Sequence, residues 1–214
     1  MNIDIPTLLR NGALFATIAS NRAERLKSLA FLAAVALGGC ALFGFALGSF
    51  VGWRVACLDA LKFAGIIAFA FALCFPTLYV FATLGGTEIG MARITALGLT
   101  VAATIGCLLA ALAPIMWLFA VSTGSTIFIV FFAFALSVIA LFFANRPIAG
   151  AIRGGVIGSS SGYNAWLIVF TTVALQTVTL MRPMLASPDA PRTPAGKCFF
   201  VRHFAGTIAA ELKR

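Results

Sequence analysis

Ionisable side chains are scarce in this chain. Asp, Glu, Lys and Arg together make up 10% of the 214 residues, whereas hydrophobic residues make up 62%. A soluble domain contains about a quarter charged residues, and the mean hydropathy of +1.07 departs from such a domain in the same direction. The composition therefore excludes an ordinary soluble domain and predicts an integral membrane protein.

Negative charge is the scarcer sign, with six acidic against fifteen basic residues and a formal net charge of +9. The cations are scattered between apolar runs, and no aromatic and basic platform or helix-turn-helix pattern accompanies them, which argues against nucleic-acid binding. Cations in such positions suit loops that face anionic lipid headgroups. We expect the partners to be the lipid bilayer with its anionic headgroups and other membrane proteins, and no nucleic acid.

Paired cysteines and clusters of metal ligands are also missing. The five cysteines include no CxxC pair, so no disulfide framework is expected. The single histidine, His203, follows Cys198 in the stretch CFFVRH, but a metal site needs three or four ligands. There is no HExxH motif, paired intramembrane Asp or Ser-Lys dyad. The sequence thus predicts no metal, no cofactor and no catalytic residue.

Long apolar runs are what the chain does contain. Each of five runs reaches or approaches the ~20 residues that cross a bilayer. None has Asp, Glu, Lys, Arg or His in its interior, and Lys62 stands at the start of the second run. The predicted fold class is an all-α membrane protein with five transmembrane helices in a bundle over residues 29–181. The expected spans are 29–51, 61–84, 95–121, 125–144 and 164–181, with a tight hairpin between the third and fourth and a loop between the fourth and fifth.

The N-terminal segment 1–28 is amphipathic and basic. Residues 3–20 predict an interfacial helix, followed by a cluster of Arg22, Arg25 and Lys27. The first apolar run comes after this segment and can itself span, so it should act as an uncleaved signal anchor. Because five spans place the two ends on opposite sides, the basic cluster predicts a cytoplasmic N-terminus and an exported C-terminus.

The C-terminal segment 182–214 begins at an Arg-Pro corner. We expect Arg182 to anchor the last span at the headgroups and Pro183 to end the helix. A Pro-rich connector then leads to a second amphipathic helix that docks on the membrane surface or on a partner. Its docking face consists of Phe200, Phe204, Ile208 and Leu212.

Small residues at four-residue spacing mark the expected helix-packing faces. Close approach of such faces holds helices together in lipid, and an intramolecular bundle is favoured over a homodimer seam. The predicted packing residues are Gly44, Gly48, Gly52, Ala64, Ala68 and Gly106.

A few positions within the spans could serve function or structure. Pro76 and Pro114 could mark unwound substrate sites, although simple kinks are favoured. Tyr79 lies in the stretch after Pro76 and belongs to the same group of candidates. Gln176 is costly to expose to lipid and should face a partner, where bridging of two helices is favoured over substrate binding.

Three stretches carry a resemblance. They are PTLYVFATLGG at 76–86, LAPI at 112–115, and Gln176 through Met181-Arg182-Pro183. In this order, with a basic amphipathic N-terminus and a Gly-rich first span, they resemble an uncharacterised family of bacterial multi-spanning inner-membrane proteins, sometimes loosely labelled actin-binding. The chain departs from that pattern at Met184, where Phe is favoured, and at Val178, where Trp is favoured. The resemblance implies a bacterial inner membrane and supplies no activity.

Three functional hypotheses follow. The leading one is a non-catalytic subunit or scaffold of a membrane protein complex, because the spans lack charge and the ends are amphipathic. The alternative is a carrier or channel for a small neutral or apolar solute that uses the kinks at Pro76 and Pro114. The third is a membrane enzyme that depends on Cys198 or His203.

Overall fold

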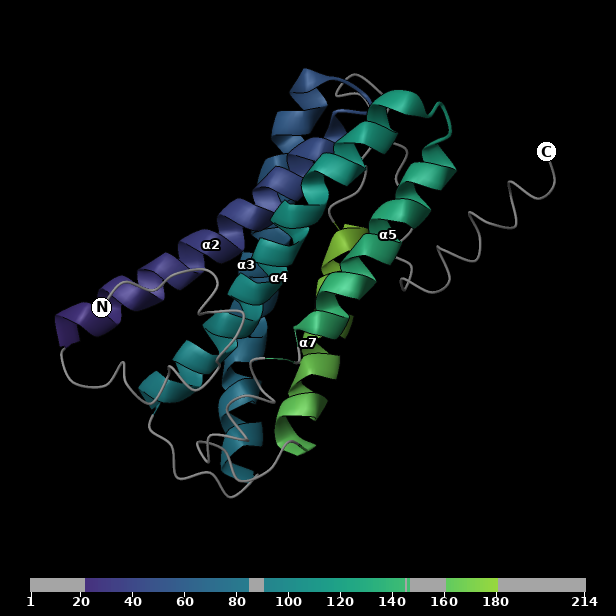
Figure 1. Ribbon diagram of the computed structural model, residues 1–214. Coiled ribbons are helices and arrows are strands. Elements are labelled where there is room, and N and C mark those ends of the chain that lie inside the picture. Colours follow the sequence, from purple (N-terminus) through teal and green to yellow (C-terminus); the bar gives the residue numbers. More distant parts are fainter. Residues whose placement is uncertain (1–21, 85–90, 145, 147–160, 181–214) are drawn as a thin grey trace.

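The computed structural model describes residues 22–84, 91–144, 146 and 161–180, and five helices lie within these ranges. They are α2 (Arg22–Gly48), α3 (Trp53–Leu84), α4 (Met91–Ser122), α5 (Thr126–Phe143) and α7 (Ser161–Leu180). Figure 1 shows them as elongated rods, with α3 and α4 between α2 on one side and α5 and α7 on the other. The prediction of an all-α chain is confirmed.

Three of these helices are long and apolar enough to cross a membrane, which makes this a multi-pass membrane protein. The candidate spans are Leu26–Gly48, Trp53–Phe81 and Ile94–Ser122. In α5 and α7 the described apolar stretches are shorter, Phe128–Phe143 and Asn164–Thr177, and fall below the ~20 residues that ~30 Å of hydrocarbon requires. The prediction of five spans is therefore wrong in number, since the described residues provide three.

The helix boundaries around the first turn also differ from the prediction. α2 starts at Arg22 and takes in the basic cluster that was assigned to the N-terminal segment, because nothing between Arg22 and Leu29 interrupts a helix. α3 starts at Trp53 instead of residue 61. The predicted span left out Arg54 and Asp59, but no Pro or Gly separates these residues from the apolar run, and the helix continues through them.

α2 makes the two most extensive helix contacts, with α4 and with α3. α7 packs against α3, and α5 packs against α4. α4 and α5 are joined by three residues, and the Ser125 side chain caps α5 by accepting a hydrogen bond from the backbone N–H of Phe128 at 3.4 Å. The result is a bundle in which the first helix holds the second and third together.

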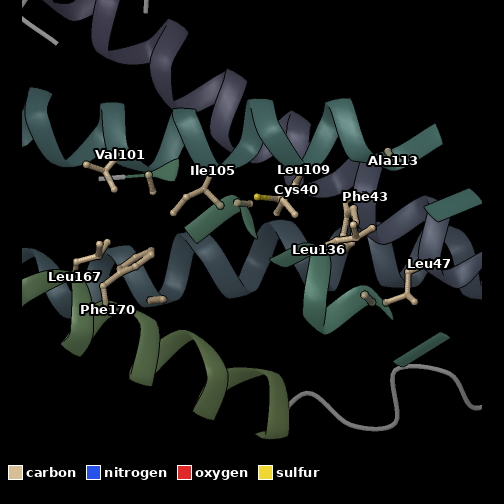
Figure 2. Packing of buried hydrophobic residues seen from close by; sticks show 14 of the residues in the cluster. Cys40, Phe43, Leu47, Val101, Ile105, Leu109, Ala113, Leu136, Leu167 and Phe170 are labelled. Atoms are coloured by element: carbon tan, nitrogen blue, oxygen red, sulfur yellow. The ribbon is translucent and has the colours of Figure 1, made fainter. Parts of the chain in front are cut away.

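The main apolar core draws on all five helices. Figure 2 shows Cys40 and Phe43 of α2 near Leu109 of α4 and Leu136 of α5, and Leu167 and Phe170 of α7 opposite Val101 of α4. A second, smaller cluster joins α2 to α4 through Leu32, Ala36, Ala96, Ala102 and Ala103. The α2–α4 contact thus consists largely of small residues, which lets two backbones approach closely.

Glycines set the distance between α2 and its two neighbours. A Cβ atom added to Gly39 would lie 2.0 Å from the carbonyl oxygen of Gly106, and one added to Gly106 would lie 2.6 Å from that of Ala36. A Cβ atom on Gly48 would lie 2.7 Å from Cα of Ala56 in α3. Gly39, Gly48 and Gly106 therefore stand where no larger residue fits without a backbone shift.

Gly52 has a different role from the predicted packing contact. Its Cβ position meets no atom within 4 Å, and its φ is +148°, a backbone conformation that favours glycine. It lies between α2 and α3, where the chain must reverse direction. Gly52 is therefore a turn residue and makes no close helix contact.

Candidate functional site

Asp59 in α3 is the only Asp, Glu, Lys or Arg among the described residues whose side chain is buried, with 0% exposure. It also lies inside the candidate span Trp53–Phe81. Ionisable residues within spans are rare and mark functional sites by default. Asp59 is therefore the centre of the candidate site.

The start of α3 places Asp59 at a shallow depth in the membrane. Trp53 is 73% exposed, and the Arg54 guanidinium lies 5.7 Å from the centre of its ring. Tryptophan and arginine side by side are typical of the boundary between headgroups and hydrocarbon. Asp59 follows Trp53 by six positions, so it lies about 9 Å further along the helix axis.

Lys62 forms an ion pair with Asp59 along the same face of α3. Its Nζ donates a hydrogen bond to Oδ1 of Asp59 at 3.2 Å. Helical side chains lean toward the N-terminus of their helix, so the lysine stem runs back toward Asp59 and toward the interface. The Lys62 side chain is 29% exposed. The pair therefore has one fully buried member and one that reaches the surface.

The second carboxylate oxygen of Asp59 lacks a donor. Oδ2 is buried, and no group in the described part of the chain donates a hydrogen bond to it. A buried charged acceptor without a donor loses its hydration without compensation, and the penalty exceeds that of a neutral group. Within the described residues, the carboxylate of Asp59 therefore has a hydrogen-bond donor for Oδ1 and none for Oδ2.

Helix α2 covers this site through Gly44. A Cβ atom added to Gly44 would lie 2.5 Å from the backbone oxygen of Asp59 and 2.8 Å from Cβ of Phe63. Beside this contact, the rings of Phe43 and Phe63 meet edge to face with centroids 5.6 Å apart. The missing side chain of Gly44 lets the α2 backbone lie directly against the turn of α3 that carries Asp59.

The other predicted packing residues divide into two groups. Gly44, Gly48 and Gly106 lie in close contacts between helices. Ala68 is exposed and Ala64 half-buried, so these two do not form the packing face of α3 within the chain. The buried positions of α3 are instead Val55, Ala56, Asp59, Ile66, Ala70, Cys74 and Leu78.

The two prolines do not open their helices. α3 continues through Pro76 and α4 through Pro114, and both residues are exposed, as is Tyr79 at 38%. The structure therefore shows no unwound segment at either proline. Gln176 lies half-buried on α7.

The remaining predicted positions lie outside the described residues. These are the corner residues Arg182 and Pro183, the pair Cys198 and His203, and the docking face Phe200, Phe204, Ile208 and Leu212. The N-terminal interfacial helix predicted for residues 3–20 lies outside them as well. Their roles stay predictions.

A second polar contact, which sequence reasoning missed, attaches α7 to α3. The indole Nε1 of Trp166, a side chain only 1% exposed, donates a hydrogen bond to the carbonyl oxygen of Cys74 at 2.9 Å. Close by on α7, a Cβ atom on Gly162 would lie 2.4 Å from the carbonyl oxygen of Phe81. A buried Trp needs an acceptor for its N–H, and the position of Trp166 inside an apolar run was the available signal.

The signal for Asp59 was its spacing from Lys62. Two residues of opposite charge three positions apart lie on the same face of a helix and can pair. The predicted span 61–84 contained Lys62 at its start and left Asp59 outside. A predicted helix that begins at Trp53, as α3 does, would include both residues and predict the pair.

Comparison of the chain with protein families, curated proteins and solved structures gave no significant match. Within the searched, described residues, no group of three or more His, Cys, Asp or Glu side chains could hold a metal ion. The chemistry of the site therefore rests on Asp59, Lys62 and the helix α2 that covers them. A buried carboxyl group beside an ammonium group can hold charge or exchange a proton.

Proposed function

We propose that this chain is a non-catalytic subunit or scaffold of a membrane protein complex. The observation that carries the proposal is the packing of α2, whose backbone lies against α4 at Gly39 and against α3 at Gly44 and Gly48. Interfaces at this distance have no room for side chains to rearrange, and packed cores do not deform continuously. A rigid core of this kind suits a scaffold that holds other subunits in place.

A carrier for a small neutral or apolar solute is the weaker alternative. Carriers with broken helices bind substrate where a span unwinds near the middle of the membrane. Here α3 and α4 run continuously through Pro76 and Pro114, and both prolines are exposed. The feature on which that alternative depended is therefore lacking in the described helices.

The surface available to partners is apolar and surrounds the core. Large side chains at outward positions include Leu61 on α3 at 72%, Phe142 on α5 at 73% and Ile168 on α7 at 68% exposure. Lipid covers such a surface wherever no protein does. A subunit of a complex should use part of it for a defined protein neighbour.

Site-specific photocrosslinking in native membranes tests the proposal. A photoreactive phenylalanine analogue is introduced at Leu61, Phe142 or Ile168, one position at a time. We expect at least one of them to give a discrete protein adduct that mass spectrometry identifies and that co-purifies in mild detergent. Phe170, which is 1% exposed, is the matched control and should react only within the chain. Lipid adducts alone at all three positions, together with a lone monodisperse monomer, would contradict the proposal.

We further propose that the membrane is a bacterial inner membrane and that the N-terminus is cytoplasmic. The resemblance described above supports the membrane. Lys27 and the arginines at the start of α2 support the orientation, because positive charge next to the first span remains on the cytoplasmic side. Reporter fusions after Ser20 and after Arg214 should report opposite sides, the first cytoplasmic.

A further inference from the structure

We propose that Asp59 is a proton-binding site, which takes up one proton on Oδ2 when the ammonium group of Lys62 moves from Oδ1 to the headgroup layer. The inference does not depend on whether the chain is a scaffold or a carrier. It stands on three features of the structure: the complete burial of Asp59, the buried Oδ2 to which no described residue donates, and the partial exposure of its ion-pair partner Lys62.

The two states of the site differ by one proton. In the paired state Asp59 is a carboxylate and Lys62 an ammonium, and the pair has no net charge. In the second state a proton from water is bound to Oδ2, Asp59 is neutral, and Lys62 keeps its three protons at the interface. The site then carries a net charge of +1, all of it on Lys62, where lipid phosphates can neutralise it.

A protonated Oδ2 can form a hydrogen bond that the carboxylate lacks. Hydroxyl groups on helices of this protein donate to a carbonyl four residues back, as Thr100 does to Ala96 at 2.9 Å and Thr104 to Thr100 at 2.8 Å. The same arrangement is open to a protonated Asp59, for which Val55 is the residue four positions back. Protonation therefore removes the buried charge and gives Oδ2 a role as a donor.

The surroundings of Asp59 favour a proton over a metal cation. Hard cations take six or more oxygen ligands, whereas Asp59 supplies one carboxylate, and no cluster of three ligating side chains occurs in the searched part of the chain. The facing turns of α2, residues 40–48, contain one titratable group, the thiol of Cys40. On α3 the neighbouring charges are Arg54 and Lys62, and Cys57 is exposed. α4 from Ile94, α5 and α7 contain no Asp, Glu, Lys, Arg or His.

Labelling with dicyclohexylcarbodiimide tests the proposal on the full-length protein in native membranes. The reagent is apolar and reacts with protonated carboxyl groups. The carboxyl proton moves to a carbodiimide nitrogen, the carboxylate oxygen bonds to the central carbon, and an acyl shift to nitrogen leaves a stable acylurea that contains every atom of both reactants. Peptide mass spectrometry then locates the adduct.

We expect an adduct on Asp59 whose rate of formation falls as the pH rises. Lys62→Met should increase that rate several-fold, because removal of the ammonium group favours the protonated state. A water-soluble carbodiimide should not label Asp59 in the parent protein, whereas Gly44→Ala, which forces α2 away from Asp59, should allow it. Asp59→Asn gives no adduct at this position and shows that the peptide assignment is correct.

Two results would overturn the proposal. One is no adduct on Asp59 in folded Lys62→Met protein under conditions that label other carboxyl groups of the same chain. The other is protection of Asp59 by sodium or lithium ions at constant pH, which would identify an alkali cation as the ligand. Retained α-helical circular dichroism and an unchanged elution volume establish that Lys62→Met and Asp59→Asn are folded.

Discussion

Helix α2 makes two glycine-lined contacts that look alike in sequence and differ in chemistry. Its contact with α4 joins Gly39 to Gly106 and is surrounded by alanines and aliphatic residues. Its contact with α3 joins Gly44 to the turn that carries Asp59, and Gly48 to Val55 and Ala56. The first depends on shape alone. The second combines shape with a buried charge pair, so only its stability should respond to pH.

The largest expected effect comes from breaking the α2–α4 contact. Gly39→Ala places a Cβ atom against the Gly106 carbonyl and should lower the free energy of unfolding by about 3 kcal/mol. Gly38→Ala is the matched control, because a Cβ atom at Gly38 meets nothing within 4 Å, and should change stability by less than about 0.5 kcal/mol. Unfolding in mixed micelles, followed by circular dichroism, measures both. Equal stability of the two variants would contradict the close contact.

The charge pair at the α2–α3 contact should give the next largest effect. Lys62→Met leaves Asp59 buried without its partner and should cost about 2 kcal/mol at neutral pH, a value reduced because Lys62 is partly exposed. Acidification should recover much of this loss. Protonation of Asp59 removes the uncompensated charge from the folded state, so stability rises as pH falls.

The double variant Asp59→Leu/Lys62→Met sharpens this test. It removes both charges and should be within about 1 kcal/mol of the parent protein, with no recovery on acidification. Gly39→Ala provides the contrast, since its loss should be independent of pH. A pH-independent loss for Lys62→Met would mean that Asp59 does not carry the difference between the two contacts.

The turn that joins α2 to α3 should be more tolerant. Gly52→Ala places a Cβ atom on a residue with φ of +148° and should cost about 1 kcal/mol through backbone strain, without a steric clash. Gly52→Asn should cost about the same, because Asn tolerates φ of about +50 to +70° but not a φ of +148°. The same unfolding assay measures both variants, and no loss in either would argue against a backbone origin.

The smallest effect is expected at α7, which lies outside both contacts of α2. Trp166→Phe removes the indole donor to the Cys74 carbonyl while it keeps an aromatic ring, and should cost about 0.6 kcal/mol, the average for a hydrogen bond between helices in a membrane. Amide hydrogen exchange should increase in α7 and leave the α2–α4 contact unchanged. Increased exchange in α2 would show that the two regions are coupled.

The sequence was sufficient for the class of protein and for part of its packing. Composition and the long apolar runs predict an α-helical membrane protein, and the four-residue spacing points to Gly44, Gly48 and Gly106. The same spacing does not show which residue of the neighbouring helix each glycine contacts. Gly39, which meets Gly106, lies one position away from the ladder that contains Gly44. Ala64 and Ala68 keep the spacing, yet Ala64 is only half-buried and Ala68 is exposed, so four-residue spacing of alanines does not by itself identify the buried face of a helix.

The site at Asp59 was not predicted from the sequence, because the second span was predicted to begin after this charged residue. The spacing of Asp59 and Lys62 permits a pair on one helix face, but only if the helix begins before residue 59. Burial of Asp59 depends on Gly44 in another helix, and sequence alone does not say which helices touch. The number of spans was overestimated because α5 and α7 are apolar in composition, while the apolar stretches described in them are shorter than a membrane span.

The hydrogen bond between Trp166 and Cys74 joins residues 92 positions apart, and this separation imposes an order on biosynthesis. When the ribosome adds Trp166, the segments that form α2, α3, α4 and α5 have already been made. α7 is therefore the last of the described helices that can dock, and the acceptor next to Pro76 is without its indole donor until then. A ribosome that stalls before residue 161 therefore leaves uncovered the face of α3 against which α7 packs.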